Sequence, residues 1–300
     1  MKKIIKKIIK KILNSVSDKT ELLAIGAMLS KQQYLMSSTN INDYEFKIFS
    51  QWGDDGIIQY LIKNIKIKNE IFIEFGVEDY QESNTRFLMM NDNWAGFVMD
   101  GSDYNMKILK NQKWYWKYHL TQKAVFIDLD NIQTLLKNTG FTNIGLFHID
   151  LDGNDYHILE AIDLTELNPS IIIMEYNSVF GLDRLISVPY DKNFNRTKAH
   201  YSNLFYGASL PAINNLAIKK GYSLVGCNKA GNNAYFVRKD LLNERVKELS
   251  LDKAFKDSNF REGRNENYSL SYLSGKDKLN MLIKDKLEVL NIETNQLEQL

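Results

Sequence analysis

The segment HIDLDGNDYHILEAI, residues 148–162, contains the side chains best suited to chemistry in this sequence. Asp150, Asp152 and Asp155 follow an apolar predicted strand, and His157 lies on the helix predicted to come next. Carboxylates and imidazoles can act as general bases that take a proton from a substrate. Ligands of open α/β sheets bind outside the carboxyl ends of the strands, so this position favours a functional site. Helix capping and, for a lone histidine, simple packing are the alternative interpretations.

Acids also end three other predicted strands. Glu74 closes IFIEF, Asp100 closes WAGFVMD, and Glu175 closes SIIIME. With Asp150, four strand ends direct carboxylates to one edge of a predicted sheet, which solvation alone explains poorly. The sequence therefore predicts that these four side chains converge.

The first predicted strand, turn and helix suggest a cofactor site. Gly76 gives the turn its flexibility, and Asp100 follows it by 24 residues, a spacing at which an acid can hold ribose hydroxyls. The turn has a single glycine, however, and a dinucleotide pyrophosphate needs closer backbone approach. The pattern therefore fits a ligand without phosphate at this turn better than a dinucleotide.

Strands and helices alternate through the middle of the chain, which predicts an α/β fold with a mostly parallel seven-stranded sheet. Residues 221–228 and 232–242 read as an antiparallel terminal pair with an Asn- and Gly-rich turn. Residues 182–207 show no period, and loops of this length are usually lids or binding loops. Asp54 and Asp55 begin another predicted helix, where capping explains them, although a place at the cofactor mouth is an alternative.

Composition narrows the class of protein. The net charge is +1, with 38 basic and 37 acidic residues, and no basic stripe favours a nucleic-acid partner. One cysteine, Cys227, excludes an intrachain disulfide and suits a cytoplasmic location. No segment reads as a signal peptide or a membrane span, so we expect neither secretion by that route nor an integral membrane protein.

Three regions follow from these patterns. Residues 1–44 are a predicted helical extension in which residues 2–13 separate isoleucines from lysines at helical period. Such a helix can contact the inner face of a membrane or pack on protein, including a second subunit in a homo-oligomer. Residues 45–240 form the predicted α/β domain, and residues 241–300 form a predicted helical or irregular extension.

Several segments together resemble a known family. SQWGDDGI, FIEFGVEDY, HIDLDGNDYHILEAI, IIIMEYNSVFG and YGASLPAINNLAIKKGYSLVGCNKAGNNAYFVR are similar to the FkbM-type class I S-adenosylmethionine-dependent methyltransferases found with bacterial surface-polysaccharide genes. The resemblance implies a Rossmann-like fold and O-methylation of a sugar hydroxyl in capsule, lipopolysaccharide or a nucleotide sugar. It places the cofactor beside seven residues: Glu74, Gly76, Asp100, Gly101, Ser102, Asp128 and Asp150. Of these, Asp100 matches the ribose ligand and Asp128 the neighbour of the adenine.

The resemblance also bears on catalysis. LDGNDY resembles the acidic turn of divalent-metal-dependent sugar O-methyltransferases, which implies that Asp152 and Glu175, with Asp150 or Asn177, bind Mg²⁺ or Mn²⁺. Without a metal, the base candidates are four: Asp152, Asp155, His157 and Glu175. The acids would then bind cofactor, cap helices or contact the sugar directly.

Two other classes of function remain alternatives at this stage. A nucleotide-sugar oxidoreductase or epimerase would also use a Rossmann-like domain, although the single-glycine turn argues against it. A non-catalytic membrane-associated scaffold would use the basic helix at residues 2–13.

Overall fold

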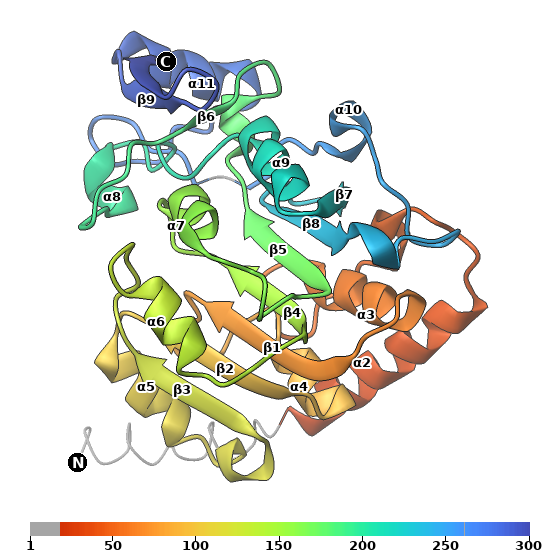
Figure 1. The fold of residues 1–300 in the computed structure, drawn as a ribbon. Coiled ribbons are helices and arrows are strands. Elements are labelled where there is room, and N and C mark those ends of the chain that lie inside the picture. The colour runs from red at the N-terminus through yellow and green to blue at the C-terminus, as the bar shows by residue number, and fades with distance from the viewer. Residues whose placement is uncertain (1–18, 261) are drawn as a thin grey trace, which may run out of the picture.

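A seven-stranded sheet forms the centre of the protein in a computed structural model that describes residues 19–260 and 262–300 (Figure 1). The strand order is β3-β2-β1-β4-β5-β8-β7. Strand β8 runs in the direction opposite to the other six strands, so it is antiparallel to both β5 and β7. This confirms the predicted mostly parallel sheet with an antiparallel terminal pair. The strands are β1 (Asn69–Phe75), β2 (Ala95–Asp100), β3 (Leu120–Ala124), β4 (Ile144–Ile149), β5 (Ile171–Glu175), β7 (Tyr222–Cys227) and β8 (Asn233–Arg238).

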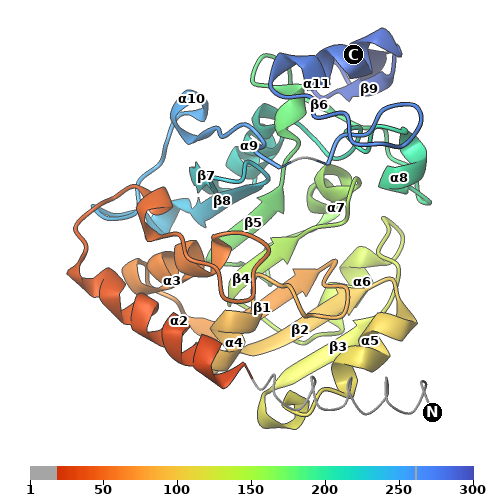
Figure 2. The same cartoon turned by 180° about the vertical axis from the view of Figure 1, so that it is seen from behind.

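Helices cover both faces of the sheet because successive strand residues point to opposite sides. Ile73 and Phe147 pack with α6, α7 and α9 on the face seen in Figure 1. Phe72 and Leu146 pack with α3, α4 and α5 on the other face, where Figure 2 also shows α2. The helices are α2 (Thr20–Gln32), α3 (Asp54–Asn64), α4 (Arg86–Asp92), α5 (Asp103–Lys110), α6 (Ile132–Lys137), α7 (Asp155–Ala161) and α9 (Leu210–Lys219).

A smaller layer lies beyond the carboxyl ends of the strands. It joins the aperiodic segment 182–207 to the C-terminal part of the chain through a second sheet, ordered β10-β9-β6. Ile186 and Val188 pack against Leu282 and Val289 in a separate hydrophobic cluster. Its elements are β6 (Ile186–Ser187), α8 (Arg196–Ala199), α11 (Lys276–Lys284), β9 (Glu288–Asn291) and β10 (Gln296–Gln299). The short helix α10 (Leu251–Ala254) packs instead on β7 of the main sheet.

The C-terminal extension differs from the prediction of helical and irregular structure, because it also holds two strands. Apolar side chains recur at helical spacing over residues 279–290, but the helix ends at Lys284. Glu288–Asn291 instead pairs with β6, and Val289 is fully buried there. A partner strand more than 100 residues away overrides the local helical period.

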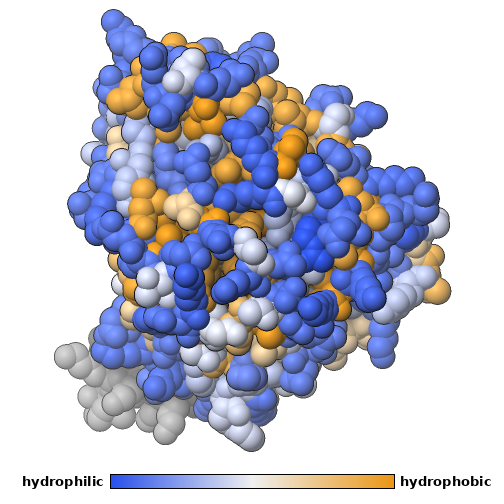
Figure 3. All heavy atoms as spheres, in the orientation of Figure 1, coloured by the Kyte–Doolittle hydropathy of each residue, from blue (hydrophilic) through white to orange (hydrophobic). Residues whose placement is uncertain are grey.

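The predicted amphipathic helix at residues 2–13 lies outside the described residues. Within the part that is described, each helix is too short or too polar to cross a bilayer. Hydrophobic side chains on the face seen in Figure 3 lie in small groups among hydrophilic ones.

Candidate functional site

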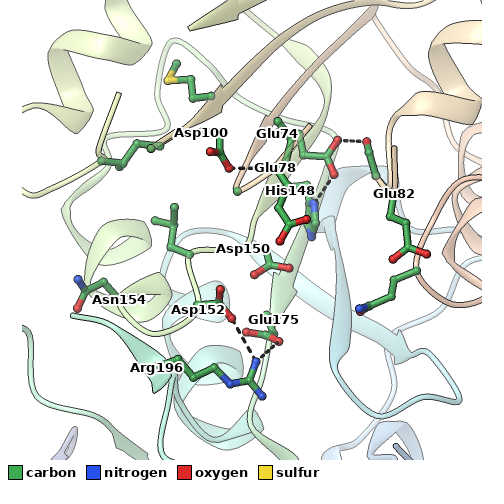
Figure 4. Close-up of a pocket in the computed structure, with 18 of the residues that line it drawn as sticks. Glu74, Glu78, Glu82, Asp100, His148, Asp150, Asp152, Asn154, Glu175 and Arg196 are labelled. Atoms are coloured by element: carbon green, nitrogen blue, oxygen red, sulfur yellow. Dashed lines mark hydrogen bonds and ion pairs between the residues drawn. The ribbon is translucent and has the colours of Figure 1, made fainter. Parts of the chain in front are cut away.

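A cavity of about 620 Å³ opens at the carboxyl ends of the parallel strands (Figure 4). The structure brings together in its wall the four strand-end acids, Glu74, Asp100, Asp150 and Glu175. These residues come from β1, β2, β5 and the turn after β4. The edge of the sheet, rather than any one segment, therefore builds the site.

Glu74 anchors the helix that follows the first strand. Its carboxylate accepts hydrogen bonds from Ser83 Oγ (2.6 Å) and Asn84 N (3.0 Å), and its Oε1 lies 3.0 Å from His148 Nδ1. Burial acts to raise the pKa of Glu74, but His148 and the hydroxyl donors outweigh it and leave the pKa below its usual value. Glu74 is therefore an ionised group that ties β1 to β4 and holds the segment that leads into α4, which begins at Arg86.

Gly76 turns the chain tightly beside β4. Its φ is +69°, and a Cβ at this position would lie 1.8 Å from the carbonyl oxygen of Asp150. Its N–H donates to the carbonyl of Met99 (3.0 Å). The single glycine of the turn is therefore required by both conformation and space.

Asp100 stands at the end of β2 with both oxygens oriented by backbone. Glu78 N donates to one oxygen (2.9 Å) and Ser102 N to the other (2.8 Å). Gly101 also lines the cavity. Ser102, a predicted cofactor ligand, does not line it, because its hydroxyl caps α5 by accepting from Asn105 N.

An apolar wall that sequence reasoning missed lies next to Asp100. Val125, Phe126 and Ile127 follow β3 and line the cavity with Leu151, and the Phe126 side chain is 54% exposed. Asp128, the predicted neighbour of the adenine, is held at the start of α6. Its carboxylate accepts from backbone N–H groups at the start of α6, lies 3.0 Å from Lys192 Nζ, and is not part of the cavity wall. The apolar run AVFI, residues 124–127, is the feature of the sequence that could have indicated this wall.

Three acids form a cluster on the opposite side of the Gly76 turn. Carboxylate oxygens of Asp150, Asp152 and Glu175 lie within 4.8 Å of one another. Glu175 is buried, and its Oε2 has no hydrogen-bond partner in the described part of the chain. Burial, followed by the charge of Asp152, raises the pKa of Asp150 to about 7. Burial and the neighbouring Asp150 raise the pKa of Glu175 well above its usual value.

Arg196 closes this side of the cavity and was not predicted. Its Nη1 lies 3.2 Å from Asp152 Oδ1 and 3.9 Å from Glu175 Oε1. Its Nη2 contacts the carboxylate of Glu262, and its guanidinium lies 3.6 Å from the ring centre of Tyr206. The sequence pointed only to the segment 182–207 as a lid, and the structure shows that segment lining the cavity.

Two predicted base candidates serve the fold instead. Asp155 is fully buried, and its oxygens accept from Leu151 N (2.7 Å) and Gly153 N (2.9 Å). His157 Nε2 lies 2.8 Å from the carbonyl oxygen of Val188. Neither of these two predicted bases lines the cavity, and the polar atoms of both are held by backbone groups.

Asn177, the alternative metal ligand, is also used by the backbone. Its amide nitrogen donates to the carbonyls of Leu204 (2.8 Å) and Tyr206 (2.9 Å), and its oxygen accepts from Val179 N (3.0 Å). It therefore fixes the lid segment and does not line the cavity.

No protein-family model matches the chain, and no curated protein matches it. Among solved structures, it is similar to an O-methyltransferase from Bacillus cereus in complex with S-adenosylhomocysteine (13% identity, 77% of this chain and 97% of that chain, TM-score 0.41). It is also similar to the N-terminal domain of EvdMO1 with S-adenosylhomocysteine bound (9%, 63% and 80%, TM-score 0.39). M. capricolum TrmK with the same product bound is a third (13%, 70% and 78%, TM-score 0.36). Likeness at this level carries no argument about function, which is inferred below from the cavity.

Proposed function

We propose that the protein is an S-adenosylmethionine-dependent methyltransferase that acts on a sugar hydroxyl. The observation that carries the proposal is one cavity with two unlike halves. Asp100 and the apolar wall of Val125, Phe126 and Ile127 form one half, and the acid cluster forms the other. The Gly76 turn lies between these halves, next to Asp150.

The first half suits an adenosine. Each oxygen of Asp100 receives one backbone N–H and keeps a further lone pair for a ribose hydroxyl. Phe126 offers an exposed ring face on which an adenine can stack. The acids around the turn then favour the positive charge of a sulfonium over a neutral thioether.

The second half suits proton removal. In the reaction, the hydroxyl oxygen forms a bond to the methyl carbon, the carbon–sulfur bond breaks, and the hydroxyl proton leaves. Burial and the charge of Asp152 raise the pKa of Asp150 to about 7, which gives a proton acceptor matched to neutral pH, and burial and the charge of Asp150 raise the pKa of Glu175. Alignment of the three reacting atoms by the cavity would supply much of the rate.

The same acids fit a divalent cation. Asp150, Asp152 and Glu175 offer oxygens within 4.8 Å of one another, and the buried Glu175 Oε2 has no other partner among the described residues. Mg²⁺ and Mn²⁺ prefer such oxygen ligands. A bound ion would supply Lewis acidity that lowers the pKa of the attacked hydroxyl. Titration of Mn²⁺ followed by electron paramagnetic resonance tests this site, and Asp152→Asn should weaken binding at least about tenfold.

Calorimetric titration with S-adenosylhomocysteine tests the function. We expect micromolar binding, weakened at least about tenfold in Asp100→Asn because charge-assisted hydrogen bonds to the ribose are lost. Asp103→Asn is the matched control, since Asp103 is exposed on α5 and does not line the cavity. Absence of binding in the wild type, or a bound nicotinamide seen by absorbance, would contradict the proposal.

A further inference from the structure

The cavity is strongly acidic. Besides the four strand-end acids it is lined by Asp152 and by Glu78, Glu82 and Glu262. Among the described lining residues, the basic groups are Arg196 and His148, and each is already paired with a carboxylate. Burial and the charge of Asp100 raise the pKa of Glu78, which reflects the crowding of negative charge. A diphosphate placed here would meet repulsion and no free cation of the wall.

The backbone offers no phosphate site either. Phosphates commonly bind the N–H groups where a strand turns into a helix. Around this cavity, three such turns hold a carboxylate of the protein itself. These carboxylates are Glu74 on Asn84 N (3.0 Å), Asp100 on Ser102 N (2.8 Å) and Asp155 on Gly153 N (2.9 Å).

A second groove, of about 600 Å³, runs beside α11. Its lining combines an aromatic ring, apolar side chains and amides, which suit the faces and hydroxyls of sugars, with three charged residues, Glu266, Asp277 and Lys284. The lining includes Tyr201, Asn265, Asn267, Leu273, Asn280 and Met281.

The groove and the cavity share a rim. Tyr201 lines the groove and Asn203 lines the cavity, so their Cα atoms are at most about 7 Å apart. The segment 262–265 also contributes to both, because Glu262 lines the cavity and Asn265 lines the groove. The two segments are joined by a hydrogen bond from Arg264 N to the carbonyl of Ser202 (3.0 Å). A chain of sugars that leaves the cavity over this rim enters the groove.

We infer that the acceptor is an assembled glycan without phosphate, whose terminal sugar occupies the acidic cavity while its next sugars occupy the α11 groove. The inference rests on the proposed function and specifies its substrate class. In the metal-free protein it excludes nucleotide sugars as acceptors, because the acids of the cavity repel their diphosphate and the strand-to-helix turns around the cavity are filled.

Calorimetry on the full chain loaded with S-adenosylhomocysteine tests this assignment. The probes are UDP-glucose, GDP-mannose and unphosphorylated oligosaccharides of one to six sugars released from bacterial capsules and lipopolysaccharide O-chains. We expect no binding of the nucleotide sugars and a gain of at least about tenfold in affinity from one sugar to four, from added contacts. Asn267→Ala with Asn280→Ala should abolish that gain and leave the affinity for S-adenosylhomocysteine unchanged.

The matched control is Asn105→Ala with Asn111→Ala, on α5 and at its C-cap, which lies outside both lining sets and should keep the gain. The inference is overturned if a nucleotide sugar binds as tightly as the best oligosaccharide, if no oligosaccharide binds better than its single sugar, or if the groove variant keeps the gain. Failure of the proposed function is distinguishable, because S-adenosylhomocysteine itself would then not bind.

Discussion

Two groups of acids, one at the start of α3 and one at the ends of β4 and β5, each contain a buried carboxylate, and the surroundings of these carboxylates differ. At the start of α3, Asp54 and Asp55 are fully buried, and each has one oxygen surrounded by donors, while its other oxygen has no hydrogen-bond partner among the described residues. Asp55 Oδ2 accepts from the N–H groups of three consecutive residues, 48–50, at 2.7–2.9 Å. At the end of β5, Glu175 is also buried but accepts no hydrogen bond within the described chain, and its nearest cation is 3.9 Å away.

The acids at the start of α3 therefore stabilise the fold, whereas Glu175 is placed to bind a ligand. Asp54 Oδ1 receives Asn228 (3.0 Å), Asn233 (2.9 Å) and the hydroxyl of Tyr235, so it ties α3 to the β7–β8 hairpin. Such donors offset the cost of burying a carboxylate. Around Glu175 the donors are missing and a cavity stands in their place, which indicates that an exogenous group completes that site.

Glu175→Gln tests most directly whether the buried Glu175 serves turnover or stability. If Glu175 serves catalysis, turnover should fall about 10³-fold, because a proton acceptor and ligand oxygen is lost. The free energy of unfolding should not fall, since burial of the neutral amide costs less than burial of the charge. Methyl transfer to the glycan and urea denaturation measure the two effects, with Glu166→Gln on an exposed loop as control. Near-normal turnover would place Glu175 with the structural acids.

The reciprocal change is Asp55→Ala. It leaves three buried N–H groups without their acceptor, so the free energy of unfolding should fall by about 3 kcal/mol. Affinity of the folded variant for S-adenosylhomocysteine should stay within about twofold, because Asp55 does not line the cavity. Urea denaturation measures the stability, and Asp103→Ala supplies the baseline for loss of an exposed acid. A stable variant with weakened cofactor binding would reverse the assignment.

Asp55 also predicts a pH dependence of stability. Burial raises the pKa of its carboxyl to about 6, above the value of 3.8 expected in the unfolded chain. The folded state therefore binds the proton more tightly, and stability contributed by this group falls as pH rises from about 4 to 6. We expect a contribution of about 2 kcal/mol across that window, absent in Asp55→Asn. Equal pH profiles for the wild type and Asp55→Asn would show that this carboxyl does not titrate there.

A smaller effect tests the cofactor half of the cavity. Phe126→Ala removes the exposed ring face and should weaken S-adenosylhomocysteine binding about tenfold with little change in stability. Leu129→Ala is the matched control, since Leu129 is exposed nearby and does not line the cavity. Unchanged affinity of Phe126→Ala would remove the adenine from this wall.

Sequence reasoning reached the sheet and the four strand-end acids because both follow from local pattern: apolar strands, turns and the residue at each strand end. The sequence did not predict contacts between residues that are far apart along the chain. Arg196 meets Glu262 only because the lid and the C-terminal extension pair through β6 and β9. Asp155 and Ser102 were assigned to the site because sequence cannot show that a backbone N–H or helix cap already uses an acceptor.

Asp128 tests whether an acid that caps a helix contributes to cofactor binding, and we expect its substitution to have the smallest effect of those considered. Asp128 follows the third strand, a position at which a cofactor ligand is expected. Its carboxylate nevertheless accepts hydrogen bonds from the backbone N–H groups of residues 130 and 131, as that of Asp55 does from backbone N–H groups. Its pairing with Lys192 is largely exposed on the lysine side, and such pairs contribute little. Asp128→Asn should therefore keep the cap, change the free energy of unfolding by less than about 0.5 kcal/mol, and leave S-adenosylhomocysteine affinity within about twofold. A tenfold loss of affinity in calorimetry would return Asp128 to the site and extend the ligand-facing acids beyond β3.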